Sequence, residues 1–147
     1  MNWKRILAGG LAAGALIDVF EGGVSGLLFG EQFQAGMAHL GLRLQVSPAG
    51  GLFFVAWGFI LGIVSIWLYA AVRPRLGPGP RTAMLVALAV WVVSGVLPHG
   101  RDAVLGILSP QLSLELILFQ LVWQVAATLL GAFLYREPVG RERMPGG

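Results

Sequence analysis

Four long apolar segments make up most of this 147-residue chain, at residues 6–30, 51–72, 82–98 and 112–135. A helix needs about 20 mostly apolar residues to cross a bilayer, and such a segment satisfies its backbone hydrogen bonds there by forming a helix. We therefore predict an all-α membrane protein with four transmembrane helices in an antiparallel bundle. The segments leave little chain between them, so residues 1–147 are expected to form a single membrane domain.

The composition agrees with a chain that lies mainly in lipid. Hydrophobic residues make up 56% of the sequence and charged residues only 12%, against roughly 25% charged residues in soluble domains. Eight of the ten basic residues precede the first segment, lie between the second and third, or follow the fourth. By the positive-inside rule, both termini are predicted to be cytoplasmic, in the cell (inner) membrane. The basic pI then reflects topology, and no nucleic-acid partner is expected.

Three of these basic residues, Arg73, Arg75 and Arg81, lie in the proline- and glycine-rich stretch between the second and third segments. We expect this stretch to be a non-helical turn whose arginines contact anionic lipid head groups. On the opposite side, residues 31–50 place apolar side chains at helical spacing. A short amphipathic helix on the outer face is predicted there, with a re-entrant segment as the alternative.

A faint internal repeat relates the two halves of the chain. Residues 24–30 resemble residues 93–100, and a tryptophan precedes a tyrosine by the same twelve-residue interval in the second and fourth segments. The matched pairs are Trp57 with Tyr69 and Trp123 with Tyr135. Two duplicated hairpins would explain this pattern, as would chance similarity among apolar helices, and both interpretations stay open.

Two carboxylates, Asp18 and Glu21, interrupt the first apolar segment near its middle. An ionisable residue inside the membrane costs a few kcal/mol, so it is usually paired, protonated or functional. The flanking glycines follow small-xxx-small patterns that allow close helix contacts. They are Gly10 with Gly14, and Gly22 with Gly26. Asp18 is therefore expected to point into a helix contact and away from lipid.

The fourth segment carries a matching polar stripe of Gln120, Gln124 and Thr128. Counting residues inward from the ends of two antiparallel helices places Asp18 opposite Gln124 and Glu21 opposite Gln120. We predict that the two stripes face each other. The contact is either an interhelical hydrogen-bond clasp, which would contribute roughly 0.6–2 kcal/mol, or a proton or cation site.

The two histidines, His39 and His99, are both expected on the outer side. They are weak candidates for a haem or metal site, because no spacing motif accompanies them. A quinone needs little more than an apolar cleft with one polar group, so it also stays open. Cysteine is absent, and no nucleophile–base arrangement is evident, so the sequence favours a protein that is not an enzyme.

Three classes of function remain. The first expectation is a structural or accessory subunit of a larger membrane assembly, with the lipid bilayer, further copies of the chain or other membrane subunits as partners. The alternative is a small proton- or cation-coupled transporter or channel that uses Asp18 and Glu21. The second alternative is a membrane redox protein that binds quinone or haem.

Overall fold

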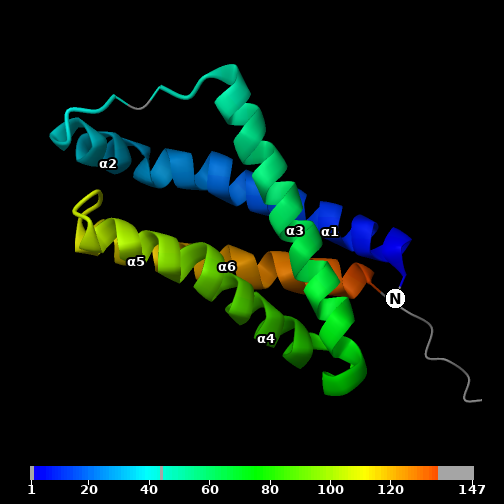
Figure 1. The fold of residues 1–147 in the computed structure, drawn as a ribbon. Helices are drawn as coiled ribbons and strands as arrows, with labels where there is room; N and C mark the ends of the chain where they lie inside the picture. Colours follow the sequence, from blue (N-terminus) through cyan, green and yellow to red (C-terminus); the bar gives the residue numbers. More distant parts are fainter. Residues whose placement is uncertain (1, 44, 136–147) are drawn as a thin grey trace, which may run out of the picture.

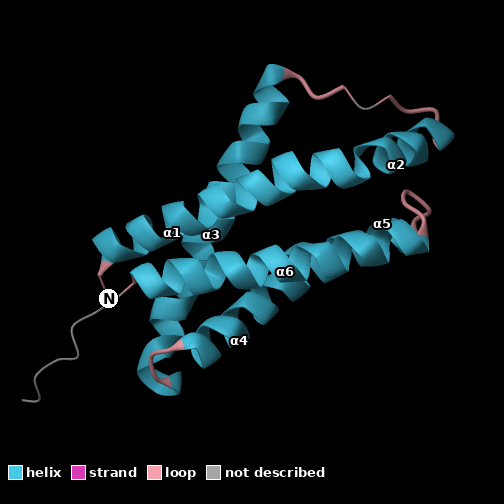
Figure 2. Cartoon of the chain, turned by 180° about the vertical axis from the view of Figure 1, so that it is seen from behind, coloured by secondary structure: helices cyan, strands magenta, loops and turns pink. Residues whose placement is uncertain are grey.

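The chain is described by a computed structural model that covers residues 2–43 and 45–135, and the described residues are helical apart from short connections (Figures 1 and 2). Eight segments follow in order, where η marks a π-helical stretch: α1 (Trp3–Asp18), η1 (Val19–Val24), α2 (Ser25–His39), α3 (Pro48–Leu76), α4 (Pro80–Trp91), η2 (Val92–Val96), α5 (Leu97–Val104) and α6 (Pro110–Leu134). They join into four helices that are long and apolar enough to cross a membrane. The expected all-α membrane class is confirmed.

The first helix is longer than its apolar segment. It runs without a break through α1, η1 and α2, from Trp3 to His39. Gly41 ends it in the left-handed region, and the Leu42 amide donates to the Met37 carbonyl at 3.0 Å, as in a Schellman motif. The separate amphipathic helix expected within residues 31–50 is therefore wrong, because no described glycine before Gly41 adopts the positive φ that would end the helix.

Serine and proline set the starts of α3 and α6. Ser47 Oγ accepts from the Gly50 amide at 3.1 Å, and Ser109 Oγ accepts from the Leu112 amide at 3.2 Å. A proline follows each serine, at a position where a missing N–H costs nothing. α3 ends only at Leu76, before Gly77 with φ of 81°. The expected non-helical turn is therefore shorter than predicted, because its first residues extend α3.

The third helix also exceeds its prediction, because it continues past Pro98 to Val104. Proline interrupts a helix mainly in the interior, where its ring clashes and its N–H is missing. Here Pro98 follows the π-helical segment η2 and lies at the beginning of α5. The altered hydrogen-bond pattern of η2 leaves a position that tolerates the proline.

The long helix α1–η1–α2 and α6 lie side by side and run in opposite directions (Figures 1 and 2). The Asn2 amide donates to Tyr135 Oη at 3.4 Å at one end, and the rings of Phe29 and Phe119 lie 5.5 Å apart further along. By contrast, α3 crosses α1 steeply and then diverges from α2 (Figure 1). The four helices therefore do not share one bundle axis.

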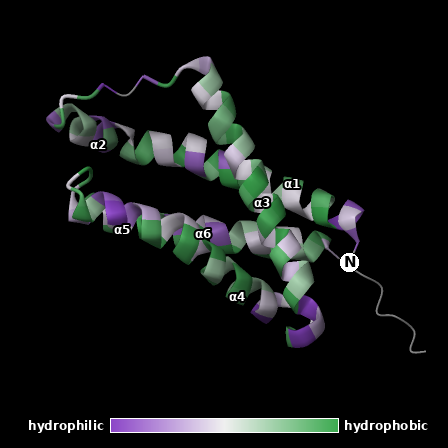
Figure 3. Cartoon of the chain, viewed as in Figure 1, coloured by the Kyte–Doolittle hydropathy of each residue, from purple (hydrophilic) through white to green (hydrophobic). Residues whose placement is uncertain are grey.

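Glycine allows the crossing of α1 and α3. A Cβ atom on Gly10 would lie 2.6 Å from Ile63 Cα, and a Cβ atom on Gly14 would lie 2.6 Å from Phe59 Cα. The main buried core lies on this side of the molecule, between α1, α4, α6 and the C-terminal half of α3. α2 has no fully buried residue, and the buried residues of α3 begin only at Gly58. One half of the molecule is thus closely packed and the other is open, with apolar residues along its helices (Figure 3).

Candidate functional site

A half-open cavity of about 580 Å³ lies where α3 diverges from α2. Its walls come from the last residue of α1, from η1, α2, the N-terminal half of α3, α5 and α6. Six aromatic side chains line it: Phe29, Phe33, Phe54, Trp57, Phe119 and Trp123. Its ionisable or amide-bearing lining residues are Asp18, Glu21, Gln34, His99 and Gln120. The described lining contains no lysine or arginine, so the cavity combines an apolar wall with two carboxylates.

Asp18 is the last residue of α1 and lies at the edge of the close crossing with α3. Its carboxyl group lies against the backbone of Gly58, in the space that a Cβ atom there would fill. Its Oδ2 atom is buried and has no hydrogen-bond partner among the described residues. A buried polar atom of this kind usually finds a partner in protein, water or an ion. Asp18 is therefore a carboxylate with unused acceptor capacity at the cavity wall.

Glu21 lies one turn further along, inside the π-helical segment η1. It is exposed and lines the cavity. Single π-helical turns within α-helices are rare and occur frequently at functional sites, because they change the direction of the side chains and free backbone groups. No sequence feature indicates η1, yet η1 carries the second carboxylate one turn after the first.

In the described part of the chain, Asp18 and Glu21 do not form the predicted hydrogen bonds with the glutamines of α6. Gln120 Nε2 donates to Ser94 Oγ at 3.1 Å. Gln124 Nε2 lies 3.3 Å from Ser65 Oγ and 3.2 Å from Thr128 Oγ1. The physical reason is the crossing of α3, which places Gly58 against Asp18 and brings Ser65 to Gln124.

A wholly buried polar cluster therefore lies beyond the cavity, toward the N-terminal end of α1. Gln124, Thr128 and Ser65 are each 0% exposed. Ser65 also donates to the Leu61 carbonyl at 2.8 Å, and Gln124 Oε1 has no partner among the described residues. These groups form a hydroxyl–amide cluster within an apolar core.

The four glycines of the first helix divide into two pairs. Gly10 and Gly14 pack closely on α3. A Cβ atom on Gly22 or Gly26 would meet nothing within 4 Å, and both residues line the cavity. The two small-residue motifs look alike in the sequence but have different surroundings, because α3 has diverged by the level of the second.

The two histidines lie in different surroundings. His99 of α5 lines the cavity, and its buried Nδ1 atom has no partner among the described residues. His39 ends α2, is exposed and does not line the cavity. Within residues 2–43 and 45–135, no group of three or more His, Cys, Asp or Glu side chains is placed to hold a metal ion.

The arginines predicted to contact lipid lie around the turn between α3 and α4. Arg73 and Arg75 lie in the last turns of α3, and Arg81 lies in the first turn of α4. Arg75 and Arg81 are exposed. The Arg73 guanidinium lies 5.7 Å from the centre of the Tyr135 ring, a cation–π geometry. This end of the molecule is therefore cationic.

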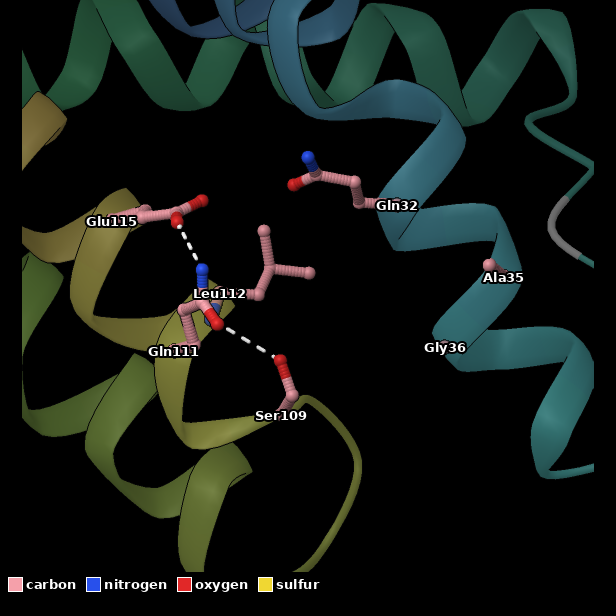
Figure 4. A pocket seen from close by; sticks show the side chains of 7 residues that line it. All are labelled: Gln32, Ala35, Gly36, Ser109, Gln111, Leu112 and Glu115. Atoms are coloured by element: carbon pink, nitrogen blue, oxygen red, sulfur yellow. Dashed lines mark hydrogen bonds between the residues drawn. The ribbon is translucent and has the colours of Figure 1, made fainter.

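A smaller pocket of about 370 Å³ separates α2 from the start of α6 (Figure 4). Gln32 faces it from α2, and Gln111 and Glu115 face it from α6. Gln111 Nε2 donates to Glu115 Oε1 at 3.0 Å. The acidic group of this pocket already has a partner, unlike Asp18 in the larger cavity.

Sequence reasoning overlooked the residues that seat the polar side chains of the cavity. A Cβ atom on Gly95 would lie 2.6 Å from Gln120 Oε1, much as Gly58 makes room for Asp18. Gly58 and Gly62 form a small-xxx-small motif in α3, which would have been the available signal. Ser94 carries no such signal, since an isolated serine in an apolar helix is common.

No family model matches the chain, and neither the curated proteins nor the solved structures contain a match. The chemistry of the cavity is therefore the basis on which a function is assigned.

Proposed function

We propose that the chain is a small proton- or cation-coupled transporter or channel that uses Asp18 and Glu21. The observation that carries this proposal is the cavity, in which two carboxylates face a largely apolar wall and the described lining residues include no lysine or arginine. Intramembrane carboxylates that face a cavity commonly mark ion or proton pathways. The chain would lie with both termini in the cytoplasm, so that the cavity occupies the outer half of the membrane.

Polar groups along α6 continue beyond the cavity into the closely packed half of the molecule. Gln120 lies at the wall, and the buried Gln124 follows one turn later with Ser65 and Thr128. Two apolar turns separate Thr128 from Tyr135 at the other end of α6, where the centres of the Tyr135 and Tyr69 rings lie 6.1 Å apart. Close packing of glycines beside this series leaves the cavity closed toward the N-terminal end of α1.

The test is ion flux into liposomes that contain the purified chain and a pH-sensitive dye. A variant with both Asp18→Asn and Glu21→Gln should abolish proton- or cation-driven flux while the protein stays folded and inserted. Glu31→Gln is the matched control, since Glu31 is exposed on α2 and does not line the cavity. Flux that is equal in the wild type and the double variant would reject the proposal.

A structural or accessory subunit is the second candidate, and the open half of the molecule favours it. α2 has no fully buried residue, and Leu52, Phe53 and Phe54 of α3 are each at least 60% exposed. Part of this surface would contact another copy of the chain or another membrane subunit. If the same double variant weakens assembly in mild detergent and no flux is measurable in any variant, this second function is favoured.

Duplication of one antiparallel helical hairpin would explain how this fold arose. The tyrosines matched in the sequence, Tyr69 and Tyr135, contact each other edge to face, and the first and third helices each contain a π-helical segment. Both observations favour the hairpin relationship. Under it, the acidic pair belongs to one half only, since its counterparts Ala87 and Val90 are apolar.

A further inference from the structure

We propose that the cavity takes an organic cation, a molecule that combines a positively charged centre with an apolar body. This inference rests on the proposed function, because it names the class of substrate that the same cavity would admit. It does not follow from the two carboxylates alone. It follows from their position in a cavity whose wall is mostly apolar, with six aromatic side chains, and whose volume exceeds the needs of an inorganic ion.

The volume and lining of the cavity fit a small organic molecule. Sites for such ligands usually measure about 300–1,000 Å³, with mostly apolar walls and a few placed polar groups. The cavity measures about 580 Å³ and is lined by six aromatic side chains. A divalent metal ion instead needs several oxygen or nitrogen ligands around one point, and the described residues provide no group of three acidic, histidine or cysteine side chains for it.

Charge complementarity determines the sign of the occupant. Asp18 and Glu21 face the cavity, and the described residues that line it include no lysine or arginine. Asp18 Oδ2 is buried without a partner among the described residues, so its charge is uncompensated there, and a positive centre beside the exposed Glu21 would supply the compensating charge. Trp57 and Trp123 also line the cavity, and indole faces attract cations. A neutral or anionic molecule of the same shape would leave the acidic side chains unpaired.

The test is binding of tetraphenylphosphonium to the full-length chain in detergent micelles, measured by equilibrium dialysis against micelles without protein. Tetraphenylborate, which has the same shape with a negative charge, is the matched probe. We expect saturable binding of the cation and none of the anion. The variants Asp18→Asn and Glu21→Gln should each bind the cation about ten-fold more weakly, the change that 1.4 kcal/mol produces, whereas Glu31→Gln should bind it as the wild type does.

Glu21→Gln keeps the test decisive if Asp18→Asn fails to fold, since Glu21 is exposed and makes no hydrogen bond or ion pair within the described part of the chain. Equal affinity of the wild type and Glu21→Gln would overturn the inference, as would equal binding of tetraphenylborate. Proton flux that requires Asp18 and Glu21, without binding of the organic cation, would refute the substrate class and leave the proposed function standing. Cation binding that requires Asp18 and Glu21, without flux of any ion, would support the specificity of the cavity for organic cations and refute transport.

Discussion

The two small-residue motifs of the first helix should respond in opposite ways to the same substitution, Gly→Ala. In Gly10→Ala, the new methyl group would lie 2.6 Å from Ile63 Cα and 2.9 Å from Ile63 Cγ1. Carbon atoms make ordinary contact at about 3.5–4.0 Å, so the helices must separate by roughly 1 Å. In Gly26→Ala, the methyl group meets nothing within 4 Å.

The difference between these two variants isolates the packing cost. Both substitutions gain a similar helix-propensity term, about 1 kcal/mol in soluble helices, and this term cancels in the comparison. Overpacking of a close contact costs about 1–3 kcal/mol, and helices in lipid depend on such van der Waals contacts. Gly10→Ala should therefore be less stable than Gly26→Ala by about 1–3 kcal/mol, which is about a 5- to 150-fold change in the unfolding equilibrium constant.

Reversible unfolding in mixed dodecylmaltoside–SDS micelles, followed by far-ultraviolet circular dichroism, measures this difference. Gly26→Ala should unfold at the wild-type SDS fraction or above it, and Gly10→Ala should unfold at a lower fraction. Equal loss of stability in both variants would show that the second motif is also a close helix contact. Greater stability of Gly10→Ala would show that α1 and α3 are not in close contact at this position.

Two further experiments test hydrogen bonds between helices. A double-mutant cycle of Gln124→Leu and Ser65→Ala in the same unfolding assay should give an interaction energy of roughly 0.6–2 kcal/mol. The reason is that Gln124 Nε2 of α6 lies 3.3 Å from Ser65 Oγ of α3. Strictly additive effects of the two substitutions would contradict this contact. Trp91→Phe should lower the free energy of unfolding by about 1 kcal/mol, because Trp91 Nε1 donates to the Ile117 carbonyl at 2.9 Å. Trp67→Phe is the control, since Trp67 has no described hydrogen bond, and it should lower the free energy of unfolding by less.

The helices were predictable from the sequence because apolar length alone determines which segments cross a membrane. Their ends were less predictable because they depend on local backbone chemistry. The first helix stops at Gly41, whose φ of 72° closes a Schellman motif, and the residues before it remain helical although they are more polar. The third helix passes Pro98 because a π-helical segment precedes it, which periodicity does not reveal.

The carboxylates were identifiable from the sequence, but their neighbours were not. Placing Asp18 opposite Gln124 assumed four helices aligned on one axis. The close approach at Gly14 and Gly62 lets α3 cross α1 instead, so the backbone of Gly58 takes the position beside Asp18. Both α3 and α6 offer small or polar residues at helical spacing, and the sequence pattern alone does not say which of them the acidic face will meet.

The polar side chains at the wall of the cavity are seated by glycines of neighbouring helices. Asp18 lies against Gly58 of α3, and Gln120 lies against Gly95 of η2. A methyl group at either glycine would overlap the polar side chain, although neither glycine has chemistry of its own. The position of the carboxylate therefore depends on how closely α1 and α3 pack. Any motion that separates these two helices would move Asp18 relative to the cavity, which would couple the packing of the closed half of the molecule to the charge in the open half.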